Sequence, residues 1–184
     1  GDTWSKGEHW AGFKWMGGVQ RMDARWARNQ ALYDGRVWQG HASSLNTLMT
    51  DSDSVLLRRP LDPERGIALL PAVDPVYEEK GAQGVVVAQI FAIKSNGAEA
   101  FAREAKEFFI RYQAVGIREA GVLVTLNVPN NFPRLPIRTD GPYLVWLGII
   151  KDDQTLETQF KPLAEQVVKA LSATGLLRGE PELI

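Results

Sequence analysis

The chain has no cysteine and only two histidines, His9 and His41. Without cysteine it can form no disulfide, no thiolate nucleophile and no thiolate-ligated metal site. Neither histidine belongs to an H-E-x-x-H or H-x-x-E-H pattern, so we expect no metal site. A cysteine-free chain is compatible with a reducing compartment, and we predict a cytoplasmic location.

The chain also lacks an excess of charge of either sign, because 21 lysines and arginines face 22 aspartates and glutamates. A net charge of -1 gives no basic surface of the kind that binds nucleic acid. No apolar run approaches the roughly 20 residues that span a bilayer. We therefore expect neither nucleic acid nor a membrane as a partner.

Sequence motifs of nucleotide binding and of hydrolysis are missing as well. There is no G-x-G-x-x-G, no P-loop and no G-x-S-x-G, so no catalytic residue can be assigned from a motif. What the chain does have is 45% hydrophobic and 23% charged residues, which is typical of a globular fold.

Residues 84–184 carry the clearest pattern, which begins with a strand, a helix and a second strand. Residues 84–94 are rich in β-branched residues and end in a turn cluster, which predicts a strand. Residues 98–115 switch to apolar side chains every three or four positions and end at Gly116, which predicts a helix with a left-handed cap. Residues 119–128 return to strand-forming types.

The second half of this region repeats the pattern. Residues 142–151 form the most apolar run and predict a central strand. Asp152 or Asp153 is expected to cap a helix over residues 154–173, in which Pro162 predicts a kink or a restart. Residues 182–184 begin a last strand.

The resulting order, strand–helix–strand–strand–helix–strand, predicts the α+β class and a ferredoxin-like βαββαβ unit. Both helices need one face of the antiparallel sheet for their apolar stripes, and the other face carries alternate residues of apolar strands. Such a face should not meet water, so we expect two sheets packed face to face.

The first part of the chain is interpreted as the end of another copy of this unit. Trp15 and Gly17 have the same spacing as Trp146 and Gly148, each pair within an apolar run that is followed by a helix. Two unrelated apolar strands are the alternative interpretation. We divide the chain into an incomplete first repeat, a linker and a complete second repeat, with the bounds 1–60, 61–83 and 84–184.

Within the first repeat the elements are predicted as follows. We expect residues 1–8 to be irregular and residues 13–19 to form a strand. A helix is predicted over residues 20–33, a shorter helical piece over 36–49 and a strand over 54–58.

Three segments of the first part, 13–16, 31–38 and 46–58, resemble bacterial NIPSNAP-domain proteins. They read FKWM, ALYDGRVW and NTLMTDSDSVLLR. The family pattern is a strand of the F-V-W-L type, a helix, a Y-x-G-x-V-W turn and an M-x-D-S-D-x-V-L-L-R segment. The resemblance implies tandem repeats packed as a dimeric α+β barrel, and it implies no established reaction. The strand, helix and strand expected ahead of Phe13 are missing. Their absence would leave a sheet edge unpaired unless another chain or a further segment covers it, so we predict a homodimer.

Seven residues are candidates for the lining of an apolar cavity. They are Trp15, Trp146, Tyr112, Arg111, Asn127, Trp38 and His41. Simpler interpretations exist for most of them: core filling for the strand tryptophans, a solvated arginine, a turn-forming asparagine and a surface histidine.

Two functions are compatible with these residues. The first is a NIPSNAP-like protein of undetermined activity that binds a small hydrophobic molecule or a protein partner, with no cofactor. The alternative is a cofactor-independent monooxygenase or a haem-handling enzyme of the same barrel superfamily. Either enzyme would use Trp146, Asn127, Tyr112 and His41, and haem would be the cofactor only of the haem-handling enzyme.

Overall fold

The computed structural model of the chain describes residues 2–6, 10–14, 27, 30–47, 56, 58–63, 67, 84–130, 132–134 and 137–184. It divides into two compact units. One comprises Gly1–Leu56, Asn127–Thr139 and Ile184, and the other comprises Leu57–Leu126 and Asp140–Leu183. Each unit is described by itself.

The second unit is a ferredoxin-like α+β layer, which confirms the predicted fold class. Its elements are β3 (Arg58–Pro60), β4 (Val85–Ala92), α3 (Ala98–Ala114), β5 (Arg118–Thr125), β6 (Tyr143–Ile150), α4 (Asp153–Thr155), the π-helix η2 (Leu156–Phe160), α5 (Lys161–Ser172) and β7 (Glu182–Leu183). The sheet is antiparallel, with the strand order β3-β5-β6-β4-β7. The last four strands of that order are the arrangement that a βαββαβ chain produces.

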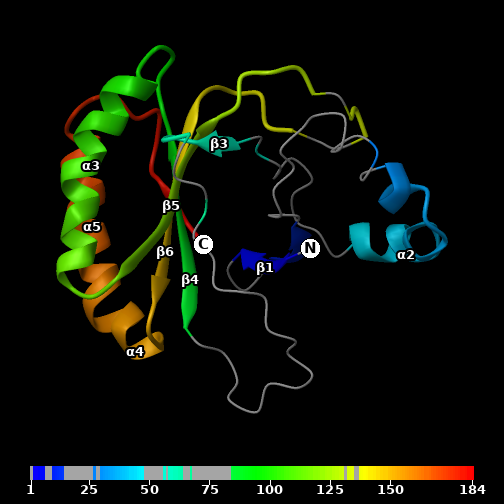
Figure 1. Cartoon of the computed structure of the whole chain (residues 1–184), viewed down its shortest axis with the longest axis horizontal. Helices are drawn as coiled ribbons and strands as arrows, with labels where there is room; N and C mark the ends of the chain where they lie inside the picture. The colour runs from blue at the N-terminus through cyan, green and yellow to red at the C-terminus, as the bar shows by residue number, and fades with distance from the viewer. Residues whose placement is uncertain are drawn as a thin grey trace. The chain divides into compact units, whose positions relative to one another are not determined.

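The helices α3 and α5 lie on one face of this sheet (Figure 1). The core between them and the sheet contains fully buried side chains from every layer, including Phe91, Phe101, Trp146, Phe160 and Leu171. Since side chains alternate along a strand, every second residue of β4 and β6 joins this core, as do Val122 and Val124 of β5 beyond the bulge at Glu119–Gly121. The remaining residues of these strands form the opposite face of the sheet.

The helix boundaries follow from local chemistry. The Asp152 side chain accepts a hydrogen bond from the backbone N–H of Thr155 at 2.8 Å, which confirms the predicted N-cap. Pro162 stands in the first turn of α5, after η2, where its missing N–H is not needed. The helical backbone continues without a break from α4 through η2 into α5, so the proline lies in a first turn, as predicted, but no new helix starts there. Gly116 follows Val115, the C-cap of α3, and has φ 82°, as a left-handed cap requires.

Gly148 explains the spacing of the tryptophan–glycine pattern. Residues two apart on a strand point to the same face, and a Cβ atom at Gly148 would collide with the outer edge of the Trp146 indole ring. The indole ring thus lies over Gly148 and reaches Glu119, which pairs with Gly148 across β5 and β6. Its Nε1–H donates to Glu119 Oε2 at 3.1 Å.

The first unit contains an antiparallel pair, β1 (Asp2–Lys6) and β2 (Trp10–Lys14), and the helix α2 (Arg36–Thr47). The expectation that residues 1–8 are irregular was wrong for Asp2–Lys6. Their partners in β2 supply backbone hydrogen bonds that the small, polar composition of the segment does not reveal. The helix predicted over residues 36–49 is confirmed as α2.

Other predictions for the first part fall wholly or partly outside the described residues. The predicted strand over residues 13–19 is described only at its start, where β2 ends at Lys14. Of the helix over 20–33, positions 27 and 30–33 are described, and they are helical. The strand predicted over 54–58 overlaps β3 at Arg58. Position 56 is not in a strand, and positions 54, 55 and 57 are outside the described part.

Candidate functional site

The face of the sheet opposite α3 and α5 is the candidate site, and we call it the helix-free face. Residues directly opposite each other on neighbouring strands share a face, so the strand register arranges it in rows. One row joins Leu123, Val145 and Ile90, and the next joins Gly121, Leu147 and Ala88. Both rows are apolar. Ile90, Val145 and Leu147 expose 8%, 7% and 5% of their surface.

A further row, nearer the start of β4, ends the apolar area. It joins Ile149 to Val86, which exposes 54% of its surface, and to Arg118 on β5. The helix-free face therefore carries an apolar strip across the three central strands. The side chains at its centre are buried, and Val86 at one corner is exposed. An apolar strip with few polar groups is a common lining of a ligand site.

Polar side chains gather at the other end of the strip, in a row formed by Arg58, Thr125 and Tyr143. Arg58 on β3 pairs with Thr125 on β5, and Arg58 Nη1 donates to Thr125 Oγ1 at 3.3 Å. Thr125 Oγ1 also accepts a hydrogen bond from the backbone N–H of Tyr143 at 2.8 Å. The Arg58 guanidinium lies 5.2 Å from the centre of the Tyr143 ring, within the range of a cation–π contact.

Arg178 approaches the same tyrosine ring, at 5.0 Å from its centre. Its Nε–H donates to the carbonyl oxygen of Ile93 at 2.8 Å, and its Nη1 lies 3.6 Å from Asp140 Oδ2. The Tyr143 hydroxyl donates to the same Asp140 oxygen at 2.5 Å. Two guanidinium groups and one carboxylate thus surround a tyrosine that is only 1% exposed. We call Arg58, Thr125, Tyr143, Asp140 and Arg178 the arginine–tyrosine row.

Gly141 makes room for Arg178. Its φ is 129°, and a Cβ atom there would lie 3.2 Å from the Arg178 guanidinium carbon. A side chain at position 141 would be strained by the backbone angle and would crowd the guanidinium group. The glycine therefore helps to fix the position of one of the two charges.

Two of the sequence-predicted site residues, Trp146 and Tyr112, come together on the helix-covered face. Their ring centres are 4.7 Å apart, within a cluster that includes Phe109 and Phe160. Trp146 therefore fills the core, which was the simpler interpretation of this residue. The two residues face away from the apolar strip described above.

The same core holds Gln89, the buried polar side chain among the described residues. The Tyr112 hydroxyl donates to Gln89 Oε1 at 2.8 Å. Burial raises the pKa of the Tyr112 hydroxyl above its usual value, and the bond to Gln89 opposes this change only in part. Tyr112 stays protonated as a donor, so its role here is structural rather than that of a general base.

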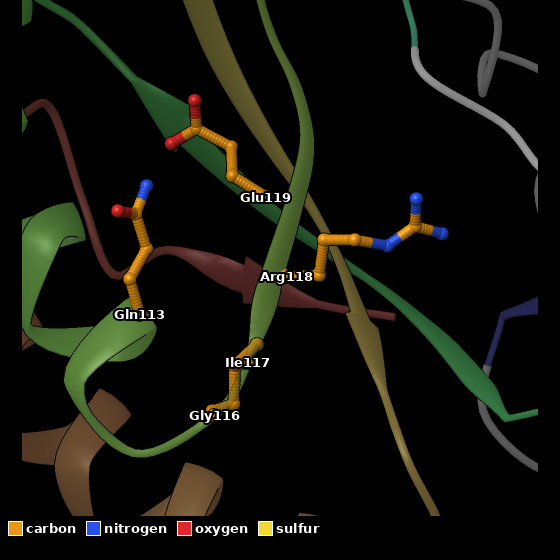
Figure 2. Close-up of a pocket in the computed structure, with 5 residues that line it drawn as sticks. All are labelled: Gln113, Gly116, Ile117, Arg118 and Glu119. Atoms are coloured by element: carbon orange, nitrogen blue, oxygen red, sulfur yellow. The ribbon is translucent and has the colours of Figure 1, made fainter.

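A hollow of about 350 Å³ lies where α3 turns into β5. It is lined by Gln113, Gly116, Ile117, Arg118 and Glu119. Figure 2 shows the Glu119 and Gln113 side chains on one side of β5 and the Arg118 side chain on the other. Since Glu119 already holds the Trp146 indole and Arg118 points away, the hollow brings few polar groups together.

The remaining predicted site residues are scattered. Arg111 is exposed on α3, with its guanidinium 4.7 Å from the Phe108 ring centre, and Asn127 is exposed just after β5. Trp38 and His41 belong to α2, where Trp38 packs against Tyr33 at 5.0 Å and His41 is exposed. Trp15 lies outside the described residues.

Sequence reasoning missed the arginine–tyrosine row. Arg58 was placed in a strand and Tyr143 in another, yet neither was linked to the other or to Arg178. Only the strand register brings Arg58 and Thr125 together, across 67 positions of sequence. Alternation along residues 142–151 could have placed Tyr143 on the face opposite Trp146, and that was the one available signal.

No family model matches this chain, and no curated protein or solved structure is significantly similar to it. None of the described helices combines the length and the hydropathy needed to cross a membrane. Within the described ranges, no cluster of three or more histidine or acidic side chains could hold a metal ion.

Proposed function

We propose that this chain is a NIPSNAP-like protein that binds a small hydrophobic molecule on the helix-free face. The observation that supports this most directly is the apolar strip across β4, β5 and β6, because neither helix of the unit covers it (Figure 1). An apolar sheet face is normally covered by another layer or a ligand and is not left in contact with water. A protein partner at the same face is the other occupant compatible with the strip.

The barrel architecture is part of this proposal. An apolar sheet face gains roughly 25 cal/mol for each Å² that it removes from water, so the strip favours a second apolar layer. The NIPSNAP resemblance suggests that a second sheet, from the first repeat or from another copy of the chain, supplies that layer. The Trp-x-Gly spacing supports the tandem repeat, since in β6 it has a physical cause and it recurs at Trp15 and Gly17. We infer a homodimer on the same grounds.

A thermal-shift screen with uncharged apolar and aromatic molecules tests the binding function. A ligand at a hundred times its dissociation constant adds about 2.7 kcal/mol to the stability of the folded state, which gives a clear rise in melting temperature. The ligand should also shift backbone amide signals of Ala88, Leu147 and Leu123, which lie in the strip.

The control is a variant with a charge on the strip. Val86→Lys places an ammonium group at the exposed corner, where the fold should tolerate it. It should weaken the ligand more than Ile110→Lys, a matched change at an exposed position on α3. Indifference to every compound, together with no recovered protein partner, would refute the proposed function.

A further inference from the structure

Asn96 and Gly97 lie in the tight turn that joins β4 to α3. Asn96 is the only asparagine in the sequence that precedes a glycine. We propose that this pair is a site of deamidation, a spontaneous covalent modification, and that the native turn holds the reaction back. The ligand function proposed above plays no part in this chemistry.

Deamidation at such a pair needs only the chain and water. The backbone nitrogen of Gly97 loses its proton and bonds to the side-chain carbon Cγ of Asn96. The Cγ–Nδ2 bond breaks, and the amide leaves with a proton as ammonia. Water then opens the resulting five-membered imide at either carbonyl carbon, which gives aspartate or isoaspartate at position 96. Glycine favours the first step because it has no Cβ atom to hinder the approach.

The conformation of the turn suits asparagine. Asn96 has φ 65°, a left-handed conformation that asparagine adopts more readily than most residues. Its side chain is exposed, like those of Lys94 and Ser95 before it. The turn thus accommodates asparagine and leaves its amide group in contact with water.

The attacking nitrogen, in contrast, is held in the native state. The Gly97 N–H donates to the carbonyl oxygen of Lys94 at 3.0 Å, and Gly97 is buried. A Cβ atom there would lie 3.1 Å from that oxygen and 3.4 Å from Ile93 Cγ2, so the turn is closely packed. The Lys94 N–H in turn donates to the Leu176 carbonyl oxygen at 2.9 Å. The nitrogen can therefore react only when the turn opens, which hydrogen exchange of the same N–H also requires.

The two products should act on α3 in opposite ways. Gly97 is the N-cap of this helix, so no side-chain oxygen caps its first turn. Aspartate at position 96 places a negative charge beside the helix N-terminus, which the helix dipole favours. Isoaspartate instead adds one carbon atom to the backbone, within the turn that the bond from Gly97 to Lys94 closes. The added atom should break that bond.

The experiment incubates the unaltered full chain at mildly alkaline pH, with and without a denaturing concentration of guanidinium chloride. Peptide mapping by mass spectrometry then measures the conversion of each asparagine. Asn96 should convert at least about tenfold faster in the unfolded chain, because the native turn opens only a small fraction of the time. Asn127 is the internal control, and in the unfolded chain it should convert far more slowly than Asn96, because the β-branched Val128 hinders the attack.

Both parts of the proposal can fail. Equal rates at Asn96 in the native and the unfolded chain would overturn the protection by the turn. A rate at Asn96 that is no higher than the rate at Asn127 in the unfolded chain would overturn the assignment of the site.

Asn96→Asp tests the first product directly. In urea titrations its folding equilibrium should shift toward the folded state by about two- to fivefold, while Asn127→Asp, the same change at an exposed position after β5, should leave the equilibrium unchanged. The isoaspartate form, separated by chromatography after incubation, should exchange the Gly97 amide proton faster than the unaltered protein. A less stable Asn96→Asp variant, or an unchanged exchange rate in the isoaspartate form, would overturn the opposite effects of the two products.

Discussion

The contact between Trp146 and Gly148 yields a quantitative prediction about the helix-covered core. Gly148→Ala adds a methyl group where the outer edge of the indole ring already lies. Trp146 is fully buried against Phe109, Tyr112 and Phe160, so the ring has no free space to enter. Overpacking of this kind lowers the free energy of unfolding by about 1–3 kcal/mol.

The same change should be favourable once the ring is smaller. Phenylalanine at position 146 ends short of the outer indole atoms, and alanine is then preferred over glycine in a strand by about 0.5–1 kcal/mol. The two substitutions should therefore couple by roughly 2–4 kcal/mol in a double-mutant cycle. Trp146→Phe alone is destabilising, because it removes the indole bond to Glu119 and leaves a small cavity.

Urea unfolding of the four proteins, followed by far-UV circular dichroism, measures this coupling. The slope m should stay unchanged across the set, so that shifts of the midpoint report stability. Additive effects of Gly148→Ala and Trp146→Phe would refute the claim that the indole ring requires a glycine two residues later.

Three further outcomes are expected. Tyr112→Phe should lower the free energy of unfolding by about 1–3 kcal/mol, because the buried side-chain carbonyl oxygen of Gln89 loses its hydrogen-bond donor. Combining Tyr112→Phe with Gln89→Leu should recover most of this lost stability in the same urea assay. Because the pKa of Tyr112 is raised in the folded state, the unfolded chain releases this proton first. The free energy of unfolding should therefore not depend on Tyr112 below about pH 10 and should fall above that pH. This fall should be shallower in Tyr112→Phe, and equal plots of stability against pH for the two proteins would contradict the burial of this hydroxyl. Asp152→Ala should destabilise the helix that starts at Asp153. Hydrogen bonds from Thr155 lower the pKa of Asp152, so the contribution of this cap to stability should be lost as the pH falls below about 4. Urea midpoints of the unaltered protein and Asp152→Ala that are equal from neutral to acid pH would contradict this prediction.

The elements with strong periodicity could be predicted from the sequence. The alternation in β4, the three-to-four spacing in α3 and the apolar run of β6 each extend over eight or more residues, so local pattern and burial agree. The cap at Asp152 and the first-turn position of Pro162 followed from side-chain chemistry alone. Such features depend on neighbours within one turn or one strand.

Other features depend on partners that the local sequence does not name. Asp2–Lys6 forms a strand because Trp10–Lys14 pairs with it, although its own residues are mostly small and polar. The arginine–tyrosine row exists only once β3, β5 and β6 have aligned Arg58 with Tyr143 and the segment after α5 has brought Arg178 to the same ring. The seven residues chosen from the sequence were selected by type, and type does not say which face a side chain joins.

The most direct measurement of the central claim is a set of intermolecular NOEs between methyl-labelled protein and a ligand found in the thermal-shift screen. We predict NOEs from the ligand protons to the methyl groups of Val145, Leu147 and Ile90, which lie on the helix-free face. NOEs only to methyl groups of the helix layer, such as Leu163 or Val168, would contradict it.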